Sequence, residues 1–211
     1  MRLSWVITVC DEIDEFQTLL GQVCKEVAKD DEIVIFQDDS KGQEFVAKVE
    51  EIVEHFRESF YNISHCRGTF AGDFAVWRNS ADRLCTGDFI IQLDADEQIQ
   101  SRLREFLELS TSKNPSLQLI AFPRENRVTG ITSEDIKEFK WYEKPEGINW
   151  PDYQLRFYKN CPEIRWKGKV HEKPTGFGRC YLAPPEARLV HIKTIEKQKR
   201  QRELYAELKS N

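Results

Sequence analysis

Strand and helix patterns alternate along the first half of the chain, and this alternation limits the folds that it can adopt. Short apolar and β-branched runs, typical of buried strands, occur at four places: residues 3–9, 32–36, 60–64 and 89–93. Apolar residues recur at helical spacing in three stretches between them: 15–28, 45–56 and 72–85. The alternation predicts an α/β fold with a mainly parallel sheet flanked by helices on both faces. Such sheets bind ligands beyond the carboxyl ends of their strands.

The pattern changes after residue 100. Helical spacing continues at about 101–110, and the strand-like runs that follow are 117–122, 153–158, 163–170 and 188–193. The polar stretch 124–150 predicts a long loop or hairpin, and long loops in compact domains often act as functional lids. We therefore expect one domain made of two halves, residues 1–98 and 99–194, with a charged helix in 195–211.

The charge balance argues against a protein built to bind nucleic acid. The formal net charge is −5 and the sequence pI is about 5.5, whereas nucleic-acid binders usually carry a basic excess. No run approaches the roughly 18 apolar residues of a membrane span, and the first residues do not resemble a signal peptide. The six cysteines form no CxxC pair, so we expect buried thiols in a cytoplasmic protein rather than disulfides or zinc ligands.

Common cofactor motifs are missing from the sequence. No GxGxxG follows a strand, and no GxxxxGK(S/T) loop is present, which argues against a nicotinamide enzyme and a P-loop NTPase. A GxSxG nucleophile elbow is also absent.

Two carboxylates follow the last apolar strand of the first half. Asp94 and Asp96 form a DxD motif, and residues i and i+2 point to the same side of a strand. Carboxylates on one side repel each other unless a cation joins them. Mn²⁺ and Mg²⁺ prefer oxygen ligands and bind through one or two carboxylates plus substrate phosphates. The motif predicts a metal site that neutralises a diphosphate leaving group; the alternative is a solvated acidic turn.

Other polar residues near the strand ends are candidates for ligand binding. Asp38 and Asp39 follow the second strand, where one of them would accept hydrogen bonds from a base or ribose; the alternative is an Asx turn with Ser40. Arg78 and Asn79 lie in the helix that precedes the DxD strand. The guanidinium fork suits phosphate, and the alternative is a surface arginine.

The second half contributes residues that suit metal binding or proton transfer. His171 and His191 are candidates for a further metal ligand, and Glu172 and Asp152 are candidates for the general base that takes a proton from an acceptor hydroxyl. A structural role is the alternative for each of the four.

Taken in order, these segments resemble family 2 glycosyltransferases with the GT-A fold, in particular the small soluble group that includes bacterial lipopolysaccharide-core glucosyltransferases. The resemblance covers roughly residues 3–193 and is most specific from Phe70 to Glu97, where it includes Arg78-Asn79, Gly87-Asp88 and Leu93-Asp94-Ala95-Asp96-Glu97. The matching segments are Trp5–Glu12, Asp31–Ser40, Phe70–Asn79, Gly87–Glu97, Asn149–Tyr158 and Gly168–Glu172. Two positions depart from the family pattern: Asp11 stands where Asn is usual, and Gln37 interrupts the usual acidic cluster.

The resemblance implies an inverting, metal-dependent hexosyl- or pentosyltransferase with a nucleotide-sugar donor, and a UDP-sugar is the expected donor. Residues 1–98 would form the nucleotide-sugar half and 99–194 the acceptor half. The implied roles are donor binding for Glu12, Asp38, Asp39, Arg78, Asn79 and Asp94; binding of Mn²⁺ or Mg²⁺ for Asp94, Asp96, His171 and His191; and general base for Glu172 or Asp152.

The acceptor stays open at this point. A glycan such as a lipopolysaccharide core is the first expectation, and a modified base in phage DNA is the second. The DNA alternative depends on a local basic patch formed by Lys197, Lys199, Arg200 and Arg202. A solvated helix paired with Glu196 and Glu203 is the other interpretation of this patch. Two further classes are a non-catalytic nucleotide-sugar-binding module and a metal-dependent nuclease or phosphatase.

Overall fold

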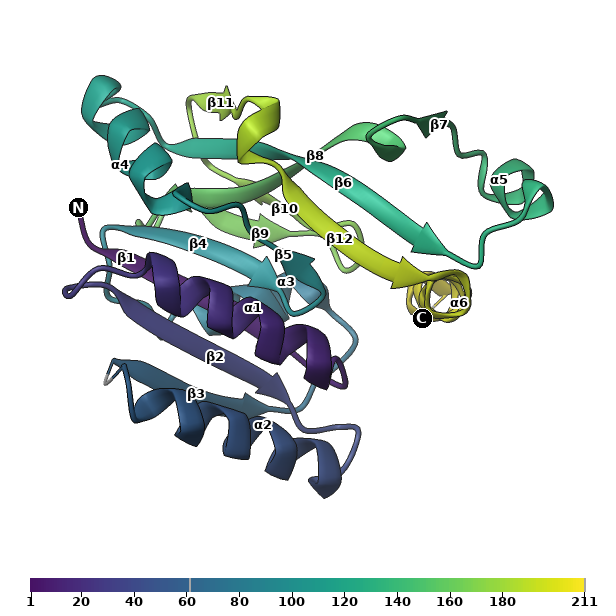
Figure 1. Cartoon of the computed structure of the whole chain (residues 1–211), viewed down its shortest axis with the longest axis horizontal. Helices are drawn as coiled ribbons and strands as arrows, with labels where there is room; N and C mark the ends of the chain where they lie inside the picture. Colours follow the sequence, from purple (N-terminus) through teal and green to yellow (C-terminus); the bar gives the residue numbers. More distant parts are fainter. Residues whose placement is uncertain (61, 211) are drawn as a thin grey trace.

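A mixed sheet forms the centre of the molecule in the computed structural model, which describes residues 1–60 and 62–210 (Figure 1). Over these residues the main sheet has ten strands, in the order β3-β2-β1-β4-β8-β6-β12-β5, with β11 beside β6 and β7 beside β8. Its parallel part consists of β1 (Leu3–Val9), β2 (Glu32–Asp38), β3 (Ile63–Gly68) and β4 (Phe89–Asp94). The α/β prediction is confirmed. The expected strand at 60–64 begins only at Ile63, and position 61 lies outside the described residues.

Helices cover both faces of the parallel strands. The helices of the first half are α1 (Ile13–Glu26), α2 (Gln43–Arg57) and α3 (Phe74–Asp82). In α1, Phe16, Leu19, Leu20 and Val23 are fully buried because the helical repeat places them on one face. They share one apolar cluster with alternate residues of β1, while α3 contributes to the second cluster on the other face. Burial on both faces explains why β1 is a nearly continuous apolar run.

The second half extends the same sheet with strands of mixed direction: β8 pairs antiparallel with its two neighbours, and β12 pairs parallel with β6. Its elements are β5 (Glu97–Gln98), α4 (Leu103–Lys113), β6 (Leu119–Thr129), α5 (Ser133–Phe139), β7 (Glu143–Lys144), β8 (Gly147–Lys159) and β12 (Leu189–Thr194). β8 pairs with both β4 and β6, so the expected halves 1–98 and 99–194 share one sheet.

The polar stretch 124–150 is not a loop over its whole length. It contains the end of β6, helix α5, β7 and the start of β8. The hydropathy pattern does not reveal these strands because the β6–β8 arm is only partly buried, so polar side chains fit it. The predicted strand 163–170 is likewise shortened to β9 (Arg165–Lys167), which pairs with β10 (Lys173–Thr175) in a separate small sheet.

The last elements are β11 (Cys180–Leu182), the short helix η1 (Pro185–Ala187) and α6 (Ile195–Ser210). Helix α6 follows β12 directly and is seen end-on beside the end of that strand in Figure 1. Position 211 lies outside the described residues. All six cysteines are free thiols, but the expectation that they are buried is wrong for Cys180, which is exposed, and the other five are only partly buried. None of the helices in the described part combines the length and the apolar character needed to cross a membrane.

Candidate active site

Acids from separate segments meet at the carboxyl edge of the parallel strands. Asp38 is the last residue of β2, and Asp94 is the last residue of β4. Glu12 lies between β1 and α1, immediately before the helix. Parallel pairing sets Thr8 of β1 beside Asp94, and Thr8 Oγ1 donates to Asp94 Oδ1 at 3.4 Å. The sheet topology therefore gathers these groups where α/β folds bind their ligands.

Asp94 is neutralised by two arginines. Arg78 Nη2 lies 2.9 Å from Asp94 Oδ1, and Arg156 Nη2 donates to Asp94 Oδ2. Burial raises the pKa of Asp94, but the guanidinium groups of Arg156 and Arg78 outweigh burial and hold that pKa well below its usual range. Asp94 is therefore an anion in the folded protein at neutral pH.

Asp96 has a different set of cations. It lies in the turn after β4, so strand alternation does not set its direction, contrary to the expectation for a DxD on a strand. Its Oδ2 atom lies 3.3 Å from His191 Nε2 and 3.5 Å from Lys197 Nζ. Burial raises the pKa of Asp96, and the stronger effects of His191 and Lys197 lower it far below its usual value.

Hydrogen bonds fix the orientation of His191. Its Nδ1 atom lies 3.0 Å from Asn126 Oδ1, while Asn126 Nδ2 donates to Asp152 Oδ2 at 3.0 Å and to the Ile148 carbonyl at 3.2 Å. Because the amide nitrogen of Asn126 faces acceptors, its oxygen must accept from His191, which places a hydrogen on Nδ1. The Nε2 atom of His191 then faces Asp96, as in metal-binding histidines whose other ring nitrogen is held by an outer hydrogen bond.

The donor atoms beside Asp96 fit a divalent cation that is bound largely by substrate. Within residues 1–60 and 62–210, no group of three or more His, Cys, Asp and Glu side chains gathers into a complete metal site. A carboxylate and an imidazole nitrogen do meet at Asp96 and His191, and Mg²⁺ commonly takes its other ligands from phosphates and water. His171 lies elsewhere: its ring packs on Tyr205 at 5.2 Å and its Nε2 atom is 3.2 Å from Lys209 Nζ.

Arg78 is held rigidly and keeps one donor free. Its Nε atom donates to Glu172 Oε1 at 2.6 Å, and its guanidinium lies 4.8 Å from the centre of the Trp166 ring. Over the described residues, Arg78 Nη1 and Arg156 Nε are buried without a hydrogen-bond partner. Buried donors are rarely left unpaired, and guanidinium N–H groups form strong hydrogen bonds with anionic acceptors.

The side-chain amide of Asn79 is bonded to the backbone of Trp166. Its amide donates to the Trp166 carbonyl at 2.9 Å and accepts from the Trp166 amide at 3.0 Å. These two bonds fasten helix α3 to β9, so the structure gives Asn79 a positioning contact with the residue beneath Arg78.

The two acids after β2 have different surroundings. Asp38 accepts from the Ser40 amide at 3.0 Å, the Ser40 hydroxyl at 2.9 Å and the Phe70 amide at 3.1 Å, which is the Asx-turn alternative. Asp39 accepts from Thr69 Oγ1 at 2.7 Å and is only half-buried. Asp39 therefore has more freedom to contact a ligand.

The two candidate bases are both ion-paired, but they differ in exposure. Arg124 donates to Asp152 Oδ2 at 2.7 Å, and Gln154 donates to Asp152 Oδ1 at 2.9 Å. The side chain of Asp152 is 31% exposed, whereas that of Glu172 is 11% exposed. Burial raises the pKa of Asp152, and the larger combined effect of Arg124 and the hydrogen bonds lowers it.

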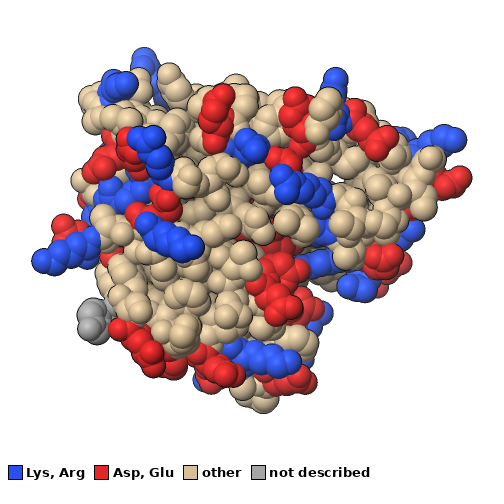
Figure 2. All heavy atoms as spheres, viewed as in Figure 1, with Lys and Arg blue, Asp and Glu red and all other residues tan. Residues whose placement is uncertain are grey.

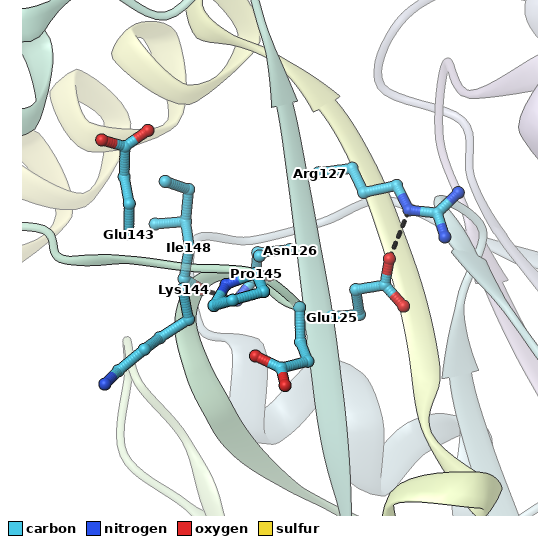
Figure 3. Close-up of a pocket in the computed structure, with 9 residues that line it drawn as sticks. Glu125, Asn126, Arg127, Glu143, Lys144, Pro145 and Ile148 are labelled. Carbon is cyan, nitrogen blue, oxygen red and sulfur yellow. Dashed lines mark hydrogen bonds and ion pairs between the residues drawn. The ribbon is translucent and has the colours of Figure 1, made fainter.

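A hollow of about 260 Å³ lies between β6 and the β7–β8 turn (Figure 3). Asn126 lines this hollow and also donates to Asp152. Carboxylates from Glu125, Glu143 and Glu146 line it together with Arg127 and Lys144. Such a polar, open wall suits a hydroxyl-rich molecule better than an apolar one.

Sequence analysis missed several residues of this site. Arg156 and Glu97 are both buried and lie 2.7 Å apart, and Glu97 Oε2 accepts from the Asp94 amide at 3.1 Å. Arg156 had a detectable signal, because a charged residue between Leu155 and Phe157 in an apolar strand requires an acid partner.

The expected partners of the basic residues in α6 are wrong. Instead of Glu196 and Glu203, Lys197 pairs with Glu12 and Asp96, Lys199 with Asp135, and Arg202 with Glu138. Acidic and basic side chains are also interspersed over the face seen in Figure 2, which shows no single basic region.

A protein-family model matches the part of the chain that contains most residues of this site. The family model for Glycosyl transferase family 2 matches residues 4–165, a span that includes the acids of β2 and β4 together with Asp152 and Arg156. The chain belongs to glycosyl transferase family 2. No curated protein matches the sequence.

Solved glycosyltransferases share the fold of this family 2 chain. The S. aureus TarS 1–349 structure is 15% identical with a TM-score of 0.62, and the alignment covers 91% of this chain and 60% of TarS 1–349. The same fragment in complex with UDP-GlcNAc gives 16% identity and a TM-score of 0.61 over 92% of this chain and 59% of that one. The mannosyltransferase PcManGT from Pyrobaculum calidifontis, in complex with GDP-Man and Mn²⁺, is 14% identical with a TM-score of 0.60, and the alignment covers 90% of this chain and 56% of PcManGT.

These similarities show the GT-A fold, and the expected family and fold are confirmed. The family 2 chain spans about 60% of the TarS 1–349 chain that it matches.

Proposed function

We propose that this chain is an inverting glycosyltransferase that moves a sugar from a nucleotide-sugar to a hydroxyl group of a glycan acceptor. The observation that carries the proposal is the pair of buried, unpaired donors, Arg78 Nη1 and Arg156 Nε, within the described residues. Both arginines also bind Asp94 at the carboxyl edge of the sheet. A diphosphate would supply the acceptors that these donors lack.

The donor is proposed to be a UDP-sugar. TarS structures contain UDP-GlcNAc or UDP, and the PcManGT structure contains GDP-Man and Mn²⁺, which supports a nucleotide-sugar for this chain. Asp39 and Glu12 would face the nucleoside, and Arg78 and Arg156 the diphosphate. Asp96 and His191 would hold Mn²⁺ or Mg²⁺, which neutralises the charge on the leaving diphosphate.

Asp152 is the proposed general base, with Glu172 as the alternative. In a single displacement, the acceptor oxygen attacks the anomeric carbon opposite the leaving diphosphate while a carboxylate takes its proton. Asp152 is the more exposed of the two acids and accepts a hydrogen bond from Asn126, which lines the hollow between β6 and the β7–β8 turn. Glu172 is better placed to orient Arg78, to which it is bonded at 2.6 Å.

A glycan acceptor is favoured over DNA. Lys197, Lys199 and Arg202 are already paired with acids, so little of the basic patch is free for phosphates.

A donor screen tests the proposal. UDP-GlcNAc, UDP-glucose and GDP-mannose are each added with and without Mn²⁺, and the thermal midpoint is followed because a ligand that binds the native state raises it. We expect one UDP-sugar to raise the midpoint when Mn²⁺ is present and to release UDP slowly. Asp96→Asn should lose this response, while Glu138→Gln, which removes an exposed ion pair between α5 and Arg202 of α6, should keep it.

Release of product separates the remaining classes. A non-catalytic module would bind the donor without releasing UDP, and a nuclease or phosphatase would release phosphate from UTP. Either result, or no response to any nucleotide-sugar, would contradict a transferase.

A further inference from the structure

Helix α6 is held on the molecule without a buried apolar stripe. Of its sixteen residues, Ile195–Ser210, only Ile195 is buried. Helices on a globular domain usually dock through an apolar stripe. The position of α6 must therefore depend on the charged and aromatic contacts that its side chains make.

The contacts of α6 lie at two places along the candidate active site. Near the start of α6, Lys197 reaches Glu12 and Asp96. Near its end, Tyr205 packs edge-on against Phe74 at 5.6 Å and against the ring of His171 at 5.2 Å, next to Glu172. The helix thus joins the DxD turn to the loop that carries a candidate base.

The ammonium of Lys197 lies beside the carboxylate of Asp96, where a divalent cation would bind. Its Nζ atom is 3.1 Å from Glu12 Oε1 and 3.5 Å from Asp96 Oδ2, and the side chain is 26% exposed. The same Oδ2 atom faces Nε2 of His191 at 3.3 Å. Asp96 Oδ2 is therefore already engaged by a protein cation, and a divalent ion bound to this oxygen would compete with Lys197 for it.

We propose that Lys197 is a donor-site residue that takes the cation position beside Asp96 while the site is empty, and that Lys197 and a divalent cation exclude each other there. The inference rests on the proposed metal-dependent transfer. When the cation binds Asp96, Lys197 loses one of its two acid partners and α6 loses one of its few attachments. The region Ile195–Ser210 then becomes more mobile as the donor site fills.

A matched pair of variants tests the competition. Lys197→Gln removes the ammonium at Asp96. Lys199→Gln removes the same charge from the same helix, but Lys199 pairs with Asp135 of α5, at 2.6 Å, and not with the DxD turn. Binding of Mn²⁺ alone, without nucleotide, is measured by electron paramagnetic resonance at fixed ionic strength. We expect Lys197→Gln to bind Mn²⁺ at least about threefold more tightly than the wild type, as suits the loss of one partly buried charge pair, and Lys199→Gln to bind it unchanged.

Hydrogen exchange gives an independent readout. Amides of residues 195–210 should exchange faster in the wild type when Mn²⁺ is added, and Lys197→Gln should exchange at the faster rate without Mn²⁺. Equal Mn²⁺ affinity in Lys197→Gln and the wild type, or the same gain in Lys199→Gln, would overturn the inference.

An Asp96→Asn variant distinguishes an error in the proposed competition between Lys197 and the cation from an error in the proposed metal-dependent function. If Asp96→Asn weakens Mn²⁺ binding and Lys197→Gln leaves it unchanged, only the competition is wrong. If Asp96→Asn binds Mn²⁺ as the wild type does, the metal site itself is wrong and the competition is overturned with it.

Discussion

Arg78 and Glu172 are 94 positions apart in the sequence, yet Arg78 Nε donates to Glu172 Oε1 at 2.6 Å. Asp94 on one side, Glu172 on another and the Trp166 ring beneath hold the guanidinium in one orientation. A donor fixed in this way is ready for an anion without further ordering. The position of Arg78 therefore links the β4 acid to the loop that carries Glu172.

Arg78→Lys should weaken UDP binding by about tenfold or more. An ammonium keeps the charge but cannot bridge Asp94 and Glu172 while presenting a further N–H to phosphate. Calorimetric titration with UDP and Mn²⁺ measures the effect. Arg202→Lys, at an exposed pair with Glu138, is the control and should bind UDP normally. Unchanged affinity in Arg78→Lys would remove this residue from the donor site.

Asp152→Asn and Glu172→Gln should fail in different ways. If Asp152 is the base, Asp152→Asn keeps UDP affinity within about threefold and lowers the rate of UDP release from the donor by about 100-fold, within the range of general-base effects. Glu172→Gln should mainly weaken UDP binding, because Arg78 loses its partner. Rates and affinities are measured on the same preparations, and the reverse pattern would assign the base to Glu172.

Asp82 should make the folded protein less stable as the pH rises. Its carboxylate accepts from Tyr158 at 2.7 Å, and burial raises the pKa of Asp82 to about 6 despite that hydrogen bond. Between the unfolded pKa of 3.8 and about 6, the folded state keeps a proton that the unfolded state has lost, so the free energy of unfolding falls with rising pH. This loss is complete above the folded pKa.

Asp82→Asn removes that pH dependence. Its stability gain over the wild type should be about 1 kcal/mol larger at pH 8 than at pH 5. Urea unfolding at the two pH values gives the comparison. A gain that is the same at both values would show that Asp82 is not protonated in the folded protein at pH 5.

The parallel core was predictable because its signals are local. The helical repeat of Phe16, Leu19, Leu20 and Val23 and the apolar run of β1 report directly on burial. The family resemblance likewise depended on residues that stand close together, from Phe70 to Glu97.

The charged contacts of the site were not predictable from spacing. Lys197 pairs with Glu12 and Asp96, which belong to distant segments, rather than with acids of its own helix. Glu97 and Arg156 meet only because β8 pairs antiparallel to β4. Such partners depend on strand order, which a local pattern does not contain.

The central claim is that Asp96 holds a cation that serves the donor diphosphate, and one titration tests it most directly. UDP is titrated by calorimetry into the wild type and into Asp96→Asn, each with Mn²⁺ and with a chelator. We expect Mn²⁺ to strengthen UDP binding by about tenfold or more in the wild type and to have no effect in Asp96→Asn. Equal UDP affinity in the wild type with Mn²⁺ and with chelator, or a full Mn²⁺ response in Asp96→Asn, would contradict it.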